Sequence, residues 1–194
     1  PERPIYLDSV IGGHDFHGGM PPMVGEHYVQ TVAIEGFPTE SYPTILSGLD
    51  ELPINYRWSN RFIYLDGTEA ASELGKYRKK WEQKVRGFKD QIYNEQKGPV
   101  NRDADNMTND ADQAISEASS GLVAFGYFTS VVVIYATDSD EVERWAKEVR
   151  RMINNRGFVA RIESINANES FIGSIPGHID YNVRRPLIST DNLS

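Results

Sequence analysis

The stretch Leu122–Asn155, LVAFGYFTSVVVIYATDSDEVERWAKEVRRMINN, decides the fold class of this chain. Leu122–Ala136 is predicted to be a long strand, and its run Val131–Ile134 is apolar on both faces, as is typical of a central strand. Over Thr137–Asn155, apolar residues recur at helical spacing, namely Val142, Trp145, Ala146, Val149, Met152 and Ile153. The sequence therefore places a buried strand directly before an amphipathic helix.

Three further strands are predicted outward from this pair because apolar and polar residues alternate. They are His27–Phe37, Ile54–Leu65 and Phe158–Glu163. In the second of them we expect Ile54, Tyr56 and Trp58 to face inward. Short helices are expected over Tyr42–Leu49 and near Asn168–Ile172.

A pair of long helices is predicted between the second and third strands. Over Thr68–Asn94, large residues recur every seven positions, at Leu74, Trp81 and Phe88. Lys97-Gly98-Pro99 ends this helix, and Asp103–Ser119 forms a second one. Its matching seam is small, with Ala104, Ala111 and Ala118. We therefore expect an antiparallel helical hairpin over Thr68–Ser119.

This element order favours an α+β fold, with a ferredoxin-like antiparallel sheet, helices on one face and the helical hairpin inserted. We expect three regions: an irregular arm over residues 1–26, the α+β body over 27–172, and a connector over 173–194. The last residues carry no helix stop or turn signal, so we expect the natural sequence to continue into a further domain.

Composition limits the class of function. The 194 residues carry a net charge of −8, which argues against general affinity for nucleic acid or anionic lipid. The chain has no cysteine, which excludes disulfides and fits a reducing cytoplasm. No apolar run approaches the roughly 18 residues needed to span a bilayer.

Motifs for catalysis are absent from the sequence. No Gly-x-x-x-x-Gly-Lys-Ser/Thr loop is present to bind a triphosphate, so we expect no cofactor in this chain. Two alternatives stay open. His14, His17 and His27 with nearby acids would suit a metal-dependent hydrolase. Aromatic strand residues would suit a single-strand nucleic-acid binder, namely Tyr56, Tyr64, Phe125, Tyr127 and Phe128.

Several blocks along the chain carry a family resemblance. They are VAIEGFP at Val32–Pro38, YRWSNRFI at Tyr56–Ile63, GLVAFGYFTS at Gly121–Ser130, SFIGSIPGH at Ser170–His178 and NVRRPL at Asn182–Leu187. In this order they resemble the N-terminal domain of the TrbE-like ATPases of type IV secretion, in the CagE/TrbE/VirB family.

The resemblance implies a parent protein that binds ATP and Mg and energises channel assembly and conjugal transfer. It also implies a cytoplasmic protein, peripherally associated with the inner membrane, whose N-terminal domain docks on inner-membrane channel components. Its own motor domain, and a second copy of the chain, are further expected partners; direct nucleic-acid binding is not expected.

Two sets of residues are candidates for these roles. The connector residues are Gly173, Pro176, Gly177, Arg184, Arg185 and Pro186. Arg184 and Arg185 have the alternative of touching a nucleotide in the motor domain. The candidate partner-binding residues lie on the first hairpin helix, at Arg78, Lys79, Lys80 and Lys84. Acidic residues on the second helix, including Asp105, Asp110, Asp112 and Glu117, offer these cations pairing across the hairpin as the alternative.

Overall fold

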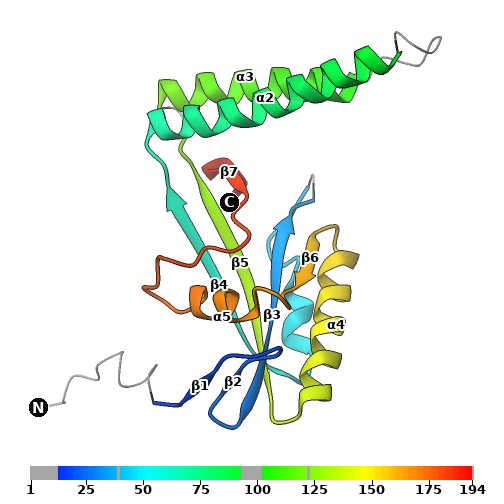
Figure 1. The fold of residues 1–194 in the computed structure, drawn as a ribbon, viewed down its shortest axis with the longest axis vertical. Coiled ribbons are helices and arrows are strands. Elements are labelled where there is room, and N and C mark those ends of the chain that lie inside the picture. Colours follow the sequence, from blue (N-terminus) through cyan, green and yellow to red (C-terminus); the bar gives the residue numbers. More distant parts are fainter. Residues whose placement is uncertain (1–12, 39, 93–101, 122, 194) are drawn as a thin grey trace, which may run out of the picture. The chain divides into compact units, whose positions relative to one another are not determined.

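Residues 13–38, 40–92, 102–121 and 123–193 are described in a computed structural model of the chain. The fold is α+β with a seven-stranded antiparallel sheet, so the predicted class is confirmed (Figure 1). The strands are β1 Phe16–His17, β2 Met23–Val24, β3 His27–Gly36, β4 Asn55–Tyr64, β5 Phe125–Ala136, β6 Val159–Ile162 and β7 Leu187–Ser189. The helices are α2 Gly67–Ile92, α3 Arg102–Ser120, α4 Ser139–Asn155 and α5 Ala167–Gly173, with 3-10 helices η1 Ser47–Glu51 and η2 Thr190–Leu193.

The two most apolar strands lie at the centre of the sheet. β3 pairs with β5 along their length, with Val32 opposite Val132, and β6 and β4 lie outside them. β1 and β2 extend the sheet from the start of β3, and β7 pairs with the first residues of β5. The central position expected for Val131–Ile134 is confirmed. The ferredoxin-like assignment stays a prediction.

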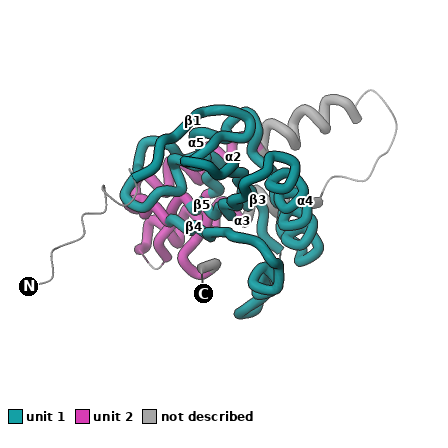
Figure 2. The backbone as a smooth tube through the Cα atoms, turned by 90° about the horizontal axis from the view of Figure 1, so that it is seen from below, with its two compact units in different colours: residues 1–61, 128–186 teal, residues 62–127, 187–194 magenta. Residues whose placement is uncertain are grey.

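The chain divides into two compact units, coloured separately in Figure 2. The first contains residues 1–61 and 128–186, and the second contains residues 62–127 and 187–194. The chain passes from one unit to the other within β4 and again within β5. Each unit has its own hydrophobic core.

The core of the first unit has two layers because β3 and β5 are apolar on both faces. On one face, α4 and η1 cover Val32, Ile34, Val132 and Ile134. The predicted apolar stripe of α4 packs there and is confirmed. On the other face, Phe171 of α5 packs against the alternate residues of β3 and β5, namely Val29, Ala33, Val131 and Val133. The expectation of helices on one face only is therefore wrong.

Two local predictions in the first unit are also wrong. No α-helix forms over residues 42–49: Thr44 has φ 70°, outside the helical region, and only the 3-10 helix η1 forms. Trp58 was expected in the core but is 42% exposed, because β4 ends the strand order of the sheet. Ile54 and Tyr56 do pack against the core, as predicted.

The second unit contains the predicted pair of long helices. α2 and α3 run side by side (Figure 1). Leu74 and Ala118, both predicted seam residues, are buried with Phe125. The other seam positions Trp81, Phe88 and Ala104 fall in residues 81–109, whose side chains lie outside the described part. A three-residue strand, β7, forms within the predicted connector and pairs with β5.

Candidate functional site

The segment Ser174–Pro186 is attached to the first unit mainly through arginine side chains of β4. Arg57 donates from Nη1 to the carbonyl of Ser174 at 2.6 Å and from Nη2 to its Oγ at 2.8 Å. Arg61 donates to the carbonyls of His178 and Tyr181, at 2.5 and 2.8 Å. Burial lowers the pKa of the Arg61 guanidinium from its ordinary value. Two cations of one strand therefore hold an irregular segment through its carbonyl groups.

The candidate connector residue Arg184 takes part in an ion-pair network. Its Nε lies 2.7 Å from Oε1 of Glu163 and 3.6 Å from Oε2 of Glu35, which also pairs with Arg161. The Glu163 side chain is only 2% exposed. The hydrogen bond from Glu163 raises the pKa of Arg184, against the opposing effect of burial. Arg184 is thus paired within this chain.

The glycines and prolines of the predicted connector shape its path. The Ile175 carbonyl accepts from the His178 N–H at 3.2 Å around Pro176-Gly177, and Gly177 has φ 85°, as a type II turn requires. A Cβ at Gly173 would lie 2.5 Å from the Tyr181 carbonyl oxygen. The turn predicted at Pro176-Gly177 is present. The Pro186 carbonyl accepts from Phe128 at 3.0 Å, and Arg185 is exposed.

The candidate partner-binding residues lie on α2, in the second unit. Arg78 pairs with Asp112 of α3 at 3.0 Å, which is the cross-hairpin pairing left open as the alternative. Lys79 and Lys80 are exposed, and Lys80 lies 5.5 Å from the centre of the Tyr77 ring. The side chain of Lys84 lies outside the described residues. The structure therefore leaves Lys79 and Lys80 at the surface of α2.

The alternative sites find little support in the described part of the chain. Over residues 13–38, 40–92, 102–121 and 123–193, no three His, Asp or Glu side chains lie together so as to hold a metal ion. Of the proposed stacking aromatics, Phe125 is buried. Tyr56 hydrogen-bonds to Asp50 through its hydroxyl. These two rings are therefore taken up by packing and pairing inside the chain.

Comparison with known proteins decides the family. The CagE, TrbE, VirB family, described as a component of the type IV transporter system, matches residues 1–184. This chain belongs to that family.

Two members of the CagE, TrbE, VirB family named for conjugal transfer align with the whole chain. It is 46% identical to a probable conjugal transfer protein TrbE of Sinorhizobium fredii, covering 29% of that protein. It is 44% identical to the conjugal transfer protein TrbE of Rhizobium radiobacter, covering 24% of it. The chain thus spans less than a third of the length of these relatives. No helix in its described part is long and apolar enough to cross a membrane.

The helix N-termini of this family member do not suit a nucleotide phosphate. Asp138 caps α4 by accepting from the Glu141 N–H at 2.9 Å. Asp66 accepts from the N–H groups of Thr68 and Glu69 at the start of α2, both at 2.8 Å. A phosphate would need these same N–H groups and would be repelled by the carboxylates. The residues that are present at these two helices therefore do not fit ATP.

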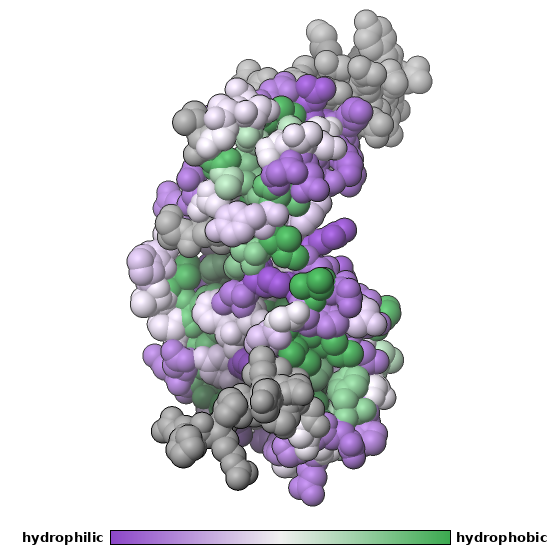
Figure 3. Space-filling model, turned by 90° about the vertical axis from the view of Figure 1, so that its left-hand side faces the viewer, coloured by the Kyte–Doolittle hydropathy of each residue, from purple (hydrophilic) through white to green (hydrophobic). Residues whose placement is uncertain are grey.

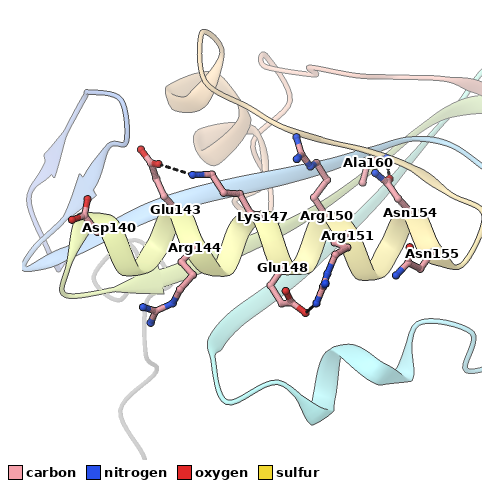
Figure 4. Close-up of a pocket in the computed structure, with 10 residues that line it drawn as sticks. All are labelled: Asp140, Glu143, Arg144, Lys147, Glu148, Arg150, Arg151, Asn154, Asn155 and Ala160. Carbon is pink, nitrogen blue, oxygen red and sulfur yellow. Dashed lines mark hydrogen bonds and ion pairs between the residues drawn. The ribbon is translucent and has the colours of Figure 1, made fainter.

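The surface pocket along α4 offers no reactive constellation either (Figure 4). Its lining is charged, and the charges are largely paired. Lys147 lies 3.3 Å from Glu143, and Arg151 lies 2.6 Å from Glu148, as the dashed lines show. Such exposed pairs at helical spacing are common on solvated helices. We assign no catalytic role to this surface.

Sequence reasoning missed Arg57, Arg61 and Glu163 as the residues that hold the C-terminal segment. The two arginines lie four residues apart on a strand, so they share a face, and that spacing was the available signal. Their partners lie 117 to 121 residues further along the chain, which no local pattern indicates.

Proposed function

We propose that this chain is the N-terminal assembly and docking domain of a type IV secretion ATPase that powers conjugal transfer. The observation that carries the proposal is the match of the whole chain to under a third of each of two conjugal transfer proteins named TrbE. A domain of that extent leaves room in the longer protein for a separate motor. In this proposal ATP and Mg bind in that motor, and this chain hydrolyses no nucleotide.

Residues 173–186 act in this proposal as the connector toward the motor domain. Arg57, Arg61 and the Arg184–Glu163 pair fix the segment to the sheet, so the chain leaves the first unit at a defined point. A fixed exit would transmit orientation better than a free linker. Because Arg184 is paired with Glu163, we favour the connector role over contact with a nucleotide.

The exposed basic face of α2 is the proposed docking surface. Lys79, Lys80 and Lys84, with Arg78, form a basic stretch on a chain whose net charge is −8. A local charge opposite to the net charge steers an acidic partner to one surface. The proposed partners are inner-membrane components of the secretion channel, which would hold the protein at the cytoplasmic side of that membrane.

The test uses the full-length ATPase with Lys79, Lys80 and Lys84 changed to Glu. We expect the melting temperature and ATP turnover to be nearly unchanged, and co-purification with the channel proteins to fall by at least about tenfold, a loss of ~1.4 kcal/mol. A matched control changes Lys147, Arg150 and Arg151 of α4 to Glu, with the same change of net charge. Equal docking by both variants would contradict the docking surface.

A second measurement tests the absence of hydrolysis. The purified 194-residue chain is incubated with ATP and Mg beside a mock preparation, and phosphate release is followed. We expect no release above the mock. Turnover that copurifies with the folded chain would overturn the division between docking domain and motor.

A further inference from the structure

The outer edge of β4 is unpaired in the described part of the chain. β4 ends the strand order of the sheet, and it is ten residues long. An edge strand presents a row of free backbone N–H and C=O groups that can pair with another strand. Natural edges are usually guarded by lysine, proline or a covering element, and β4 contains neither lysine nor proline. Its cations Arg57 and Arg61 are bonded to the segment over one face.

The most exposed large apolar residue of β4 in the first unit is Trp58, which is 42% exposed. Its indole N–H donates to Ser130 Oγ of β5 at 2.8 Å, so the polar atom of the ring has a partner inside the chain. What Trp58 offers to solvent is therefore apolar ring surface. Exposed tryptophan with a satisfied N–H is typical of the centre of a protein interface.

Other aromatic rings continue from Trp58 across the same face of the sheet. Phe128 lies on that face of β5, two residues before Ser130, the partner of Trp58. The Phe37 ring centre lies 5.7 Å from that of Phe128 and 6.1 Å from that of Phe158, and Phe37 is 40% exposed. We call Trp58, Phe128, Phe37 and Phe158 the aromatic band. Figure 3 looks from the side on which β4 lies in Figure 1, and hydrophobic residues reach the surface there.

We propose that two copies of this chain associate by antiparallel pairing of their β4 edges, which extends both the sheet and the aromatic band across a two-fold axis. The occupant of the edge is a second copy because the strand is self-complementary in charge. This inference does not depend on the proposed docking or on the motor domain.

The charges of β4 restrict the register of such a pair. In a two-fold antiparallel pair, opposite residues share a face, so the axis passes through a residue position. An axis at residue 57, 59 or 61 sets Arg57 or Arg61 opposite another arginine, which is destabilising. An axis at Trp58 sets Trp58 opposite itself and Arg57 opposite Ser59. An axis at Asn60 also avoids like charges, so the two-fold lies at one of these two even positions.

The association is tested by light scattering on the 194-residue chain. We expect a mass of twice 21.9 kDa at high concentration. Asn60 is exposed on β4, and Asn60→Lys places a charge at the pairing edge, so the dimer dissociation constant should rise by at least about tenfold. The matched control is Val159→Lys on β6, an exposed residue on the edge strand beyond β3, and it should leave the constant unchanged.

The register is tested with a single spin label, since the chain has no cysteine and Asn60→Cys is its only attachment point. An axis at Trp58 or Asn60 puts the two residue-60 backbones about 5–14 Å apart, from the strand spacing and the rise per residue. We expect dipolar broadening for this label and none for a label at Val159→Cys.

Three outcomes would overturn the proposal. The first is a chain that remains a monomer at high concentration. The second is a dimer that is indifferent to Asn60→Lys and gives no broadening at residue 60. The third is an edge that pairs only with an extended segment of another protein. Phosphate release and docking are measured separately, so failure here leaves the proposed function unaffected, and the reverse also holds.

Discussion

The Nε atom of Arg184 lies 2.7 Å from Oε1 of Glu163, and its Nη2 lies 3.4 Å from Oε2. The Glu163 carboxylate is 2% exposed, while Arg184 is 28% exposed. This pair joins the C-terminal segment to the residue that follows β6.

Arg184→Met is expected to lower the free energy of unfolding by about 2–3 kcal/mol, because it leaves Glu163 buried without its partner. The value is below the ~3–5 kcal/mol of a fully buried pair because Arg184 is partly exposed. Arg161→Met is the matched control: Arg161 is 55% exposed and pairs with Glu35, so the cost should stay under ~1 kcal/mol. Urea denaturation measures both, and equal costs would contradict a special role for the Glu163 pair.

Tyr56 should titrate well above an ordinary tyrosine. Its hydrogen bond to Asp50, with burial and the Asp50 charge, raises the pKa of Tyr56 from 10.0 to about 12. A raised folded pKa contributes stability that is present below pH 10 and is lost as the pH rises toward 12. Tyr56→Phe should therefore flatten the alkaline loss of stability. Ultraviolet titration of wild type minus Tyr56→Phe checks this, and a difference curve centred near pH 10 would refute it.

Gly126 and Gly75 should respond oppositely to alanine. A Cβ at Gly126 would lie 2.4 Å from the Ile63 carbonyl oxygen and 2.5 Å from the Phe62 ring, so Gly126→Ala should destabilise by about 1–3 kcal/mol. At Gly75, within α2, nothing lies within 4 Å of a new Cβ, so Gly75→Ala should stabilise by ~0.5–1 kcal/mol. Thermal melts compare the two, and a shift of the same sign would contradict the packing at Gly126.

The start of α4 depends on one carboxylate. Asp138→Ala removes the acceptor for the Glu141 N–H and should cost about 1 kcal/mol. Asp138→Asn keeps a capping oxygen and is the conservative control, expected to cost a few tenths of that. If both variants lost equal stability in chemical denaturation, the capping bond would not be the cause.

The sequence alone was sufficient for the elements whose cores repeat along the chain. The apolar stripe of α4 and the two-faced run in β5 were visible because burial on a helix or strand imposes a period of 3.6 or 2. The family was likewise readable, since the matching blocks occur in order along nearly the whole chain. Local burial and local order leave their record in local sequence.

The tertiary structure decided which elements meet and which residues are left free. Arg61 reaches Asn182, 121 residues away, and Phe171 of α5 covers the face of the sheet opposite α4. Trp58 has the alternation of an inward residue, yet it is exposed because β4 has an outer edge. Strand order and side-chain partners depend on contacts between residues far apart in the chain, and a hydrophobic period within one strand or helix carries no information about them.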